Sequence, residues 1–250
     1  MPPVCLHLGI AKEAIERLQH PVLLQYQGSC LLGSTAPDMR IITAATREET
    51  HFFDLVDDSY GSSAEGFFDK YPGLHEVAKL NYPTKAFVCG YLSHLVTDEV
   101  WICEVYRPFF GEGSALADDP LANVLDRALQ FELDRRERAD PRKVLEFQGL
   151  LADSDKGVEV GFADAATLHQ WQEFVYTAVG REPSWDRFPI FAQRFLIAEQ
   201  KVDAEHLEVF LASVRSKVEG ILDHVGTQQL AVFREKSIAD SVRIAGEYLG

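Results

Sequence analysis

A histidine and an aspartate, His94 and Asp98, stand four residues apart in the most apolar stretch of the sequence. On a helix this spacing puts both side chains on one face, where they can bind one metal ion together. A buried hydrogen bond between them explains the same spacing and would be preferred for an isolated pair. A carboxylate in such apolar surroundings must be neutralised, however, and a cation shared with other ligands does this. The pair therefore predicts a buried metal site.

Three further residues of the N-terminal half are candidate ligands for the same ion. His7 precedes the first predicted helix, Asp38 follows Pro37 on a predicted turn, and His51 opens the next segment. Each has an ordinary alternative, because a histidine among apolar neighbours is often a core residue and an aspartate after proline is often a cap or turn residue. Imidazole and carboxylate ligands without a thiolate cluster suit zinc, although other divalent metals also accept them.

Helices must position these residues. Apolar side chains recur at three- and four-residue steps over residues 8–19, which predicts an amphipathic helix. Pro83 and Thr84 signal the start of a long helix from about residue 85 to about residue 106, which is apolar on nearly all sides and so is expected at the centre of the core. A second apolar segment, residues 22–32, leads into the turn that carries Asp38.

The rest of the chain repeats the helical pattern with little sign of a sheet. A surface loop is expected at residues 111–120, and residues 60–66 and 149–164 are irregular. Further helices are expected at residues 121–137, 167–180, 187–201, 204–225 and 228–249. We therefore predict an all-α, single-domain multi-helix bundle over residues 1–250, with a ligand-bearing half at 1–110 and additional helices at 121–250.

Composition limits the classes of function. Hydrophobic residues make up 46% and charged residues 25% of the 250 residues, which is typical of a globular domain. The formal net charge of −15 disfavours nucleic-acid binding. The apolar run at residues 86–96 is too short to span a bilayer, and no secretory signal is visible, so a cytoplasmic location is expected. The scattered cysteines form no Cys-x-x-Cys pair and are expected to be reduced core residues, namely Cys5, Cys30, Cys89 and Cys103.

The candidate ligands and their neighbours resemble, in order, a signature of the bacterial zinc-dependent phospholipase C family, a helical family related to single-strand-specific nucleases. The resemblance covers roughly residues 4–110 and rests on His7, Gly33-Ser34-Thr35-Ala36-Pro37-Asp38, His51 and Gly90-Tyr91-Leu92-Ser93-His94-Leu95-Val96-Thr97-Asp98-Glu99. It implies that Asp38, His51, His94 and Asp98 bind one zinc, that His7 and a bridging Asp98 hold a neighbouring ion, and that Asp38 is a candidate catalytic base.

The sequence departs from the family at its other ligands. The phospholipases use the α-amino group and side chain of an N-terminal tryptophan, whereas the first tryptophan here is Trp101. Glu104 stands where the family places another histidine. A reduced site of one or two metals is therefore expected rather than three.

Two places could supply the histidine and glutamate that the family spaces as His-x-x-x-Glu. His169 and Glu173 keep the spacing but lie far along the chain, whereas Ala128 and Glu132 lie at a more suitable distance and keep only the glutamate. We favour Glu132 as a further metal ligand. A solvated helix face is the ordinary explanation of either glutamate.

The resemblance implies a zinc-dependent hydrolase of the phospholipase C type, in which a metal-activated water attacks a phosphoester. Its expected partner is a small-molecule or lipid-like substrate. Two alternatives stay open. The same fold could act on a small metabolite that is not a phospholipid, or the metal could be structural in a non-catalytic protein. The sequence predicts no oligomeric state.

Overall fold

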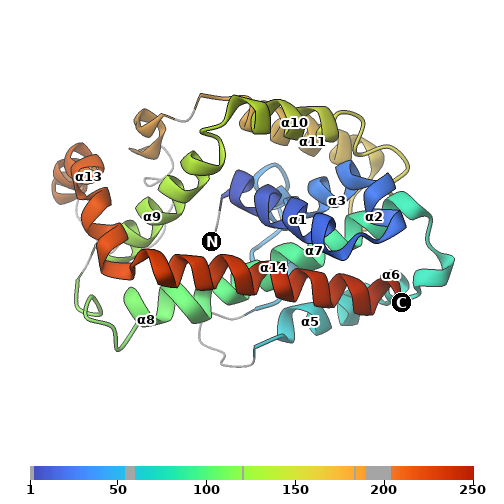
Figure 1. Ribbon diagram of the computed structural model, residues 1–250, viewed down its shortest axis with the longest axis horizontal. Helices are drawn as coiled ribbons and strands as arrows, with labels where there is room; N and C mark the ends of the chain where they lie inside the picture. Colours follow the sequence, from blue (N-terminus) through green and yellow to red (C-terminus); the bar gives the residue numbers. More distant parts are fainter. Residues whose placement is uncertain (1–2, 54–59, 120, 183, 190–203) are drawn as a thin grey trace.

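The computed structural model describes residues 3–53, 60–119, 121–182, 184–189 and 204–250, and within them the regular elements are helices without a strand (Figure 1). The elements of the first part are α1 (Val4–Leu18), α2 (Pro21–Gln25), α3 (Gln27–Gly33), η1 (Ala36–Ile41), α4 (Glu48–His51), α5 (Ser62–Lys70), α6 (Pro72–His75), η2 (Val77–Lys79) and α7 (Tyr82–Trp101). The later elements are η3 (Ile102–Tyr106), α8 (Arg107–Phe109), α9 (Ala122–Glu137), α10 (Pro141–Leu151), α11 (Ala165–Val179), η4 (Trp185–Arg187), α13 (Ala204–Val225) and α14 (Thr227–Leu249). The predicted all-α class is confirmed.

Helix α7 is the centre of the molecule. It starts at Asn81, whose side chain accepts a hydrogen bond from the backbone N–H of Thr84 at 2.9 Å, with Pro83 in the first turn. Nearly all of its side chains are buried, and it packs against α3 on one side and α14 on another (Figure 1). The predicted central helix is therefore confirmed.

The α-helical geometry of α7 ends earlier than the predicted residue 106. The chain continues as the π-helix η3, Ile102–Tyr106, before α8. Pro108 has no N–H to donate to the carbonyl oxygen of Glu104, four residues earlier, and that oxygen instead accepts a hydrogen bond from Gln229 of α14 at 2.9 Å. The proline thus accounts for the change of helical geometry.

Two glycines let α3 and α7 approach until their backbones touch. A Cβ atom on Gly90 would lie 1.9 Å from the carbonyl oxygen of Cys30, and one on Gly33 would lie 2.0 Å from that of Phe87. Any side chain at either position would separate the helices. This contact fixes the turn after α3 beside the middle of α7, where His94 lies.

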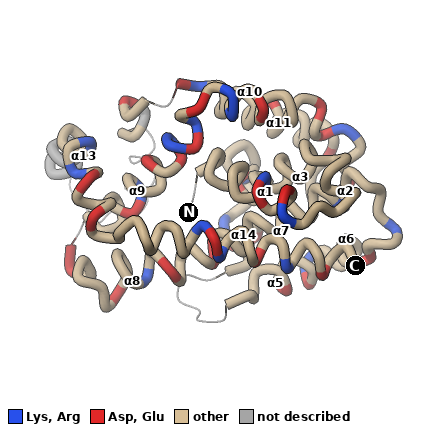
Figure 2. The backbone as a smooth tube through the Cα atoms, in the orientation of Figure 1, with Lys and Arg blue, Asp and Glu red and all other residues tan. Residues whose placement is uncertain are grey.

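The second half of the chain packs directly on the first. Helix α1 contacts α9, α11 and α14, α9 contacts α13, and α10 contacts both α11 and α3. Figure 2 shows acidic and basic residues interspersed along the outer helices. No helix in the described part of the chain is long and apolar enough to cross a bilayer. All four cysteines are free thiols, and Cys5, Cys30 and Cys89 are buried in the core as expected, whereas Cys103 is only half-buried.

Several predicted boundaries change. Residues 22–32 form two helices that meet at Tyr26, and the irregular stretch at residues 60–66 begins helix α5. Helix α10 was not predicted and includes the start of the region expected to be irregular, residues 149–164. His51 ends α4 rather than opening a segment, because Phe52 follows in the left-handed region with φ 55°. Most of the helix predicted at residues 187–201 lies outside the described residues.

Candidate metal centre

The five N-terminal candidate ligands converge in one cluster, which we call the metal centre: His7, Asp38, His51, His94 and Asp98. They come from α1, η1, the end of α4 and two successive turns of α7. The three histidines and Asp98 are buried, with at most 2% of each residue exposed. The side chain of Asp38 is 17% exposed, which makes it the most solvent-accessible member of the cluster.

Asp98 lies between the histidines. Its Oδ1 atom is 3.5 Å from Nε2 of His7, and its Oδ2 atom is 3.6 Å from Nε2 of His51 and 3.7 Å from Nε2 of His94. Neither carboxylate oxygen accepts a hydrogen bond from a described residue. Asp38 Oδ1 lies 3.7 Å from Nε2 of His51. The donors form two groups of three that share His94, one with His7 and Asp98 and the other with Asp38 and His51.

The orientation of His94 is set by the turn after α3. Its Nδ1 atom lies 2.8 Å from the carbonyl oxygen of Ser34. A carbonyl oxygen can only accept, so Nδ1 carries the proton and Nε2 presents a lone pair toward Asp98. Metal-binding histidines commonly donate their other ring N–H to a backbone carbonyl, as His94 does here. The ring of His7 stacks on that of His94, with centroids 3.8 Å apart and planes at 9°.

His51 is oriented by its neighbour Thr50. Nδ1 of His51 lies 2.8 Å from the Thr50 hydroxyl oxygen, and that hydroxyl can donate to the carbonyls of Thr46 and Arg47, each at 3.2 Å. The hydroxyl oxygen therefore accepts from Nδ1, which leaves a lone pair on Nε2 of His51. Tyr91 of α7 holds this arrangement, because its hydroxyl donates to the carbonyl of Thr50 at 2.7 Å.

Burial shifts Asp98 and His51 toward their neutral forms. It raises the pKa of Asp98 to about 7, although the neighbouring His94 and Arg47 oppose this rise. It also holds the pKa of His51 well below its usual range, with further lowering by His94, Arg47 and Arg40. The cluster therefore disfavours protonated imidazole beside Asp98. Lone pairs of two imidazoles face a carboxylate, and a metal cation stabilises such an arrangement.

The spacing of the donor atoms fits zinc. Four ligands at about 2.0–2.1 Å around a tetrahedral ion lie roughly 3.3 Å from one another. Here Nε2 of His94 is 3.4 Å from Nε2 of His51, and the nitrogen–oxygen separations named above run from 3.5 to 3.7 Å. The donor set and the unsatisfied oxygens of Asp98 both agree with a bound zinc ion.

Two other buried carboxylates hold the helices that carry the centre. Asp134 of α9 accepts a hydrogen bond from the N–H of Cys5 at 2.7 Å, which caps α1 just before His7. Glu99 of α7 accepts from the N–H groups of Gly61 at 2.7 Å and Ser63 at 2.8 Å, which caps α5. Sequence analysis missed both roles, because a cap supplied by a distant helix leaves no local spacing.

The structure does not bring Glu132 to the other candidate ligands. Its carboxylate accepts hydrogen bonds from Arg135 at 2.7 Å and Arg136 at 2.8 Å, and these bonds keep its pKa below the usual range despite burial. The exposed His169 lies 3.1 Å from Asp155 instead. Neither belongs to the groups of possible ligands found among the described residues.

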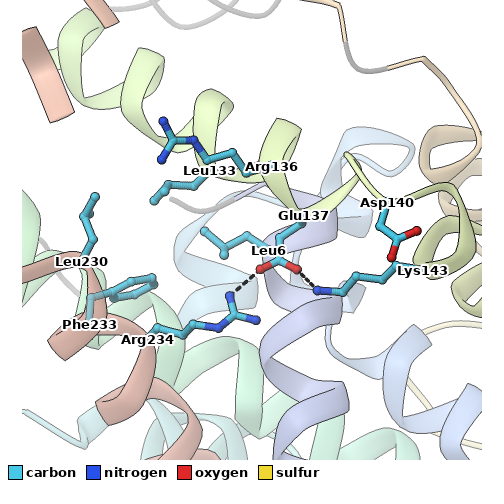
Figure 3. Close-up of a pocket in the computed structure, with 9 residues that line it drawn as sticks. All are labelled: Leu6, Leu133, Arg136, Glu137, Asp140, Lys143, Leu230, Phe233 and Arg234. Atoms are coloured by element: carbon cyan, nitrogen blue, oxygen red, sulfur yellow. Dashed lines mark hydrogen bonds and ion pairs between the residues drawn. The ribbon is translucent and has the colours of Figure 1, made fainter. Parts of the chain in front are cut away.

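A cavity of about 350 Å³ lies between α1, α9, α10 and α14, away from the five ligands (Figure 3). Glu137 occupies its wall, paired with Arg234 and Lys143. Gly9 of α1 makes room for this pair, since a Cβ there would lie 2.6 Å from Oε2 of Glu137. Arg234 also pairs with Glu13, so two carboxylates meet two cations and the cavity acts as packing around an ion-pair network.

Comparison with known proteins agrees with the resemblance in the sequence. Residues 6–101, which contain all five candidate ligands, match the family described as zinc dependent phospholipase C. Searches of curated proteins and of solved structures found no match. The family match and the clustered histidines and aspartates support a zinc-dependent, hydrolase-type function.

Proposed function

We propose that this chain is a zinc-dependent hydrolase of phosphoester bonds, with the zinc bound by His7, Asp38, His51, His94 and Asp98. The observation that carries the proposal is Asp98. Its carboxylate is buried within 3.7 Å of three imidazole nitrogens and accepts no hydrogen bond from a described residue. An uncompensated carboxylate at this depth would cost several kcal/mol, roughly, and a divalent cation removes that cost.

The two groups of three donors, which share His94, suit one or two zinc ions. Nδ1 of His51 and Nδ1 of His94 donate to Thr50 and to the carbonyl of Ser34, so Nε2 of each ring is the atom left to bind a metal. The carboxylate of Asp98 has one oxygen toward His7 and the other toward His51 and His94, as a bridging ligand requires. Zinc supplies two things when bound, polarisation of a phosphoryl oxygen and a lowered pKa of a bound water.

We infer that Asp38 is the residue of the centre that acts on substrate. It is the ligand that solvent reaches most easily, since its side chain is 17% exposed whereas those of His51 and Asp98 are 1% and 3% exposed. A carboxylate there can accept the proton of an attacking water.

The test combines metal content with turnover. Protein purified without added metal is analysed for zinc and assayed on a phosphomonoester, a soluble phosphodiester and phosphatidylcholine vesicles. His94→Ala should lose zinc and lower the rate on the preferred substrate by at least about 100-fold. His169→Ala is the matched control, because this exposed histidine lies outside the centre. This variant should retain the zinc and the rate of the wild type.

The outcomes separate the alternatives. One or two zincs per chain with phosphoester turnover would support the proposal and identify the substrate among the three. Zinc without turnover on any of them would contradict phosphoester hydrolysis and favour a structural ion or a different small substrate. No zinc after supplementation would contradict the metal centre itself.

A further inference from the structure

Two arginines lie next to the metal centre in a chain whose net charge is −15. Arg40 and Arg47 both belong to the segment between Asp38 and His51. The Nε atom of Arg40 is 3.9 Å from Oδ1 of Asp38, and Arg47 donates a hydrogen bond to the carbonyl of Phe53 at 3.0 Å. Both positive charges act on His51. They are therefore part of the electrostatic environment of the centre.

Arginine beside a cation site needs an explanation. A guanidinium is always charged and repels a metal ion, so each arginine weakens zinc binding. Arg40 lies 3.9 Å from Asp38, so a divalent ion bound by Asp38 would stand close to the guanidinium charge. An anion bound at the same place would offset this repulsion.

Arg40 has unused hydrogen-bonding capacity. It donates no hydrogen bond to a described residue, and its Nε atom is buried although the side chain as a whole is 27% exposed. The distance of 3.9 Å to Asp38 is too long for a hydrogen bond. A planar guanidinium with free N–H groups at the solvent-accessible edge of the centre matches the oxygens of a phosphoryl group.

We propose that Arg40 binds the phosphoryl group of the substrate beside Asp38 of the metal centre. The inference rests on the proposed phosphoester hydrolase and adds a residue that recognises the charged phosphoryl group, which a neutral carbonyl substrate lacks. Arg40 donates to a non-bridging oxygen, and Asp38, two residues earlier, is also partly exposed there, with 17% of its side chain exposed against 27% for Arg40. Its neighbour Arg47 adds charge while it anchors the chain after His51 through Phe53.

A purely structural role for Arg40 predicts a different result. If its ion pair only positioned Asp38, removal of the guanidinium would disorder a ligand and weaken zinc binding. As an anion-binding residue it opposes the metal, so its removal should leave zinc affinity unchanged or raise it while phosphate affinity falls. Zinc and phosphate affinities therefore separate the two roles.

The experiment measures zinc affinity by competition with a chelator and the affinity of the zinc-loaded protein for inorganic phosphate by calorimetry. Arg40→Gln should weaken phosphate binding about 10- to 100-fold, as expected for one lost hydrogen bond between charged groups. Arg40→Lys keeps the positive charge without the planar guanidinium, so its phosphate affinity should fall less than that of Arg40→Gln. Arg142→Gln is the control, because this arginine is 91% exposed and pairs with Asp140, and it should match the wild type.

Assays on two substrates show whether the phosphoryl group comes from a free phosphomonoester or from a lipid headgroup. Glycerol phosphate represents a free phosphomonoester, and phosphatidylcholine vesicles represent a lipid headgroup. A fall in kcat/KM for Arg40→Gln with either substrate supports the inference and assigns that source. Unchanged phosphate affinity, weaker zinc binding in Arg40→Gln, or no phosphate binding by the wild type would overturn it. If the wild type hydrolysed neither substrate yet bound phosphate through Arg40, the proposed reaction would fail while the anion site would stand.

Discussion

Replacement of Asp98 by asparagine should change stability in opposite directions with and without zinc. The folded protein without metal holds the pKa of Asp98 at about 7, against an ordinary value of 3.8. The folded state therefore binds a proton between about pH 4 and pH 7 that the unfolded state releases, and its stability falls as the pH rises through that window. A shift of this size is worth about 4 kcal/mol, with 1.36 kcal/mol per pKa unit.

Asparagine carries no charge, so it removes the free-energy cost of ionising residue 98 in the folded protein. At pH 8 without metal, Asp98→Asn should be more stable than the wild type by a few kcal/mol, up to about 4. Its amide N–H groups can also donate to the lone pairs on His51 and His94. With zinc the order reverses, because zinc at 1,000 times its dissociation constant stabilises the wild type by about 4 kcal/mol and the variant has lost a ligand.

The assay is urea unfolding at pH 8 in chelator and in excess zinc. Asp126→Asn is the matched control, because burial raises the pKa of Asp126 to about 7 as well, while its carboxylate accepts hydrogen bonds from Trp101 at 2.9 Å and Gln130 at 2.7 Å. The change in the free energy of unfolding caused by Asp126→Asn should be the same in chelator and in excess zinc. If Asp98→Asn destabilised the protein equally with and without zinc, the reasoning would be refuted.

Three further predictions concern the residues around the centre. Thr50→Val removes the hydroxyl that orients His51 and should weaken zinc binding about 10-fold or more, measured by chelator competition. Gly90→Ala puts a Cβ 1.9 Å from a backbone oxygen and should destabilise the fold by about 3 kcal/mol or more. Gly149→Ala is its control, because the Cβ there meets open space, and it should stabilise the fold by about 1 kcal/mol. Thermal unfolding measures both changes. Glu132→Gln should leave the zinc content unchanged by elemental analysis, while the wild type loses the ion-pair stabilisation of this glutamate as the pH falls through its lowered pKa.

That His94 and Asp98 share one face of a helix could be predicted from their spacing alone, but only their apolar surroundings favoured a metal over a hydrogen bond. His94 and Asp98 are four residues apart in an apolar helix, and this local geometry survives in any packing. His7, Asp38 and His51 come from three other elements, so their meeting depends on tertiary structure. Their order along the chain, through the family resemblance, was the signal that placed them with the α7 pair, and the structure brings all five together.

The rest could not be predicted for two different reasons. Glu132 stays a prediction, but arginines three and four residues later on the same helix already pair with its carboxylate. The roles of Thr50, Tyr91 and Glu99 depend on backbone groups of other elements, which no spacing reveals. The capacity of Arg40 for an anion follows only from its lack of hydrogen bonds to described residues in three dimensions.

The most direct test of the metal centre is anomalous diffraction at the zinc edge from crystals of the zinc-loaded protein. We predict a peak within about 2.0–2.2 Å of Nε2 of His51 and His94 and of a carboxylate oxygen of Asp98. A second peak near His7 would mean two ions bridged by Asp98. An ordered zinc bound elsewhere, or no peak among these residues in protein shown to contain zinc, would contradict the account.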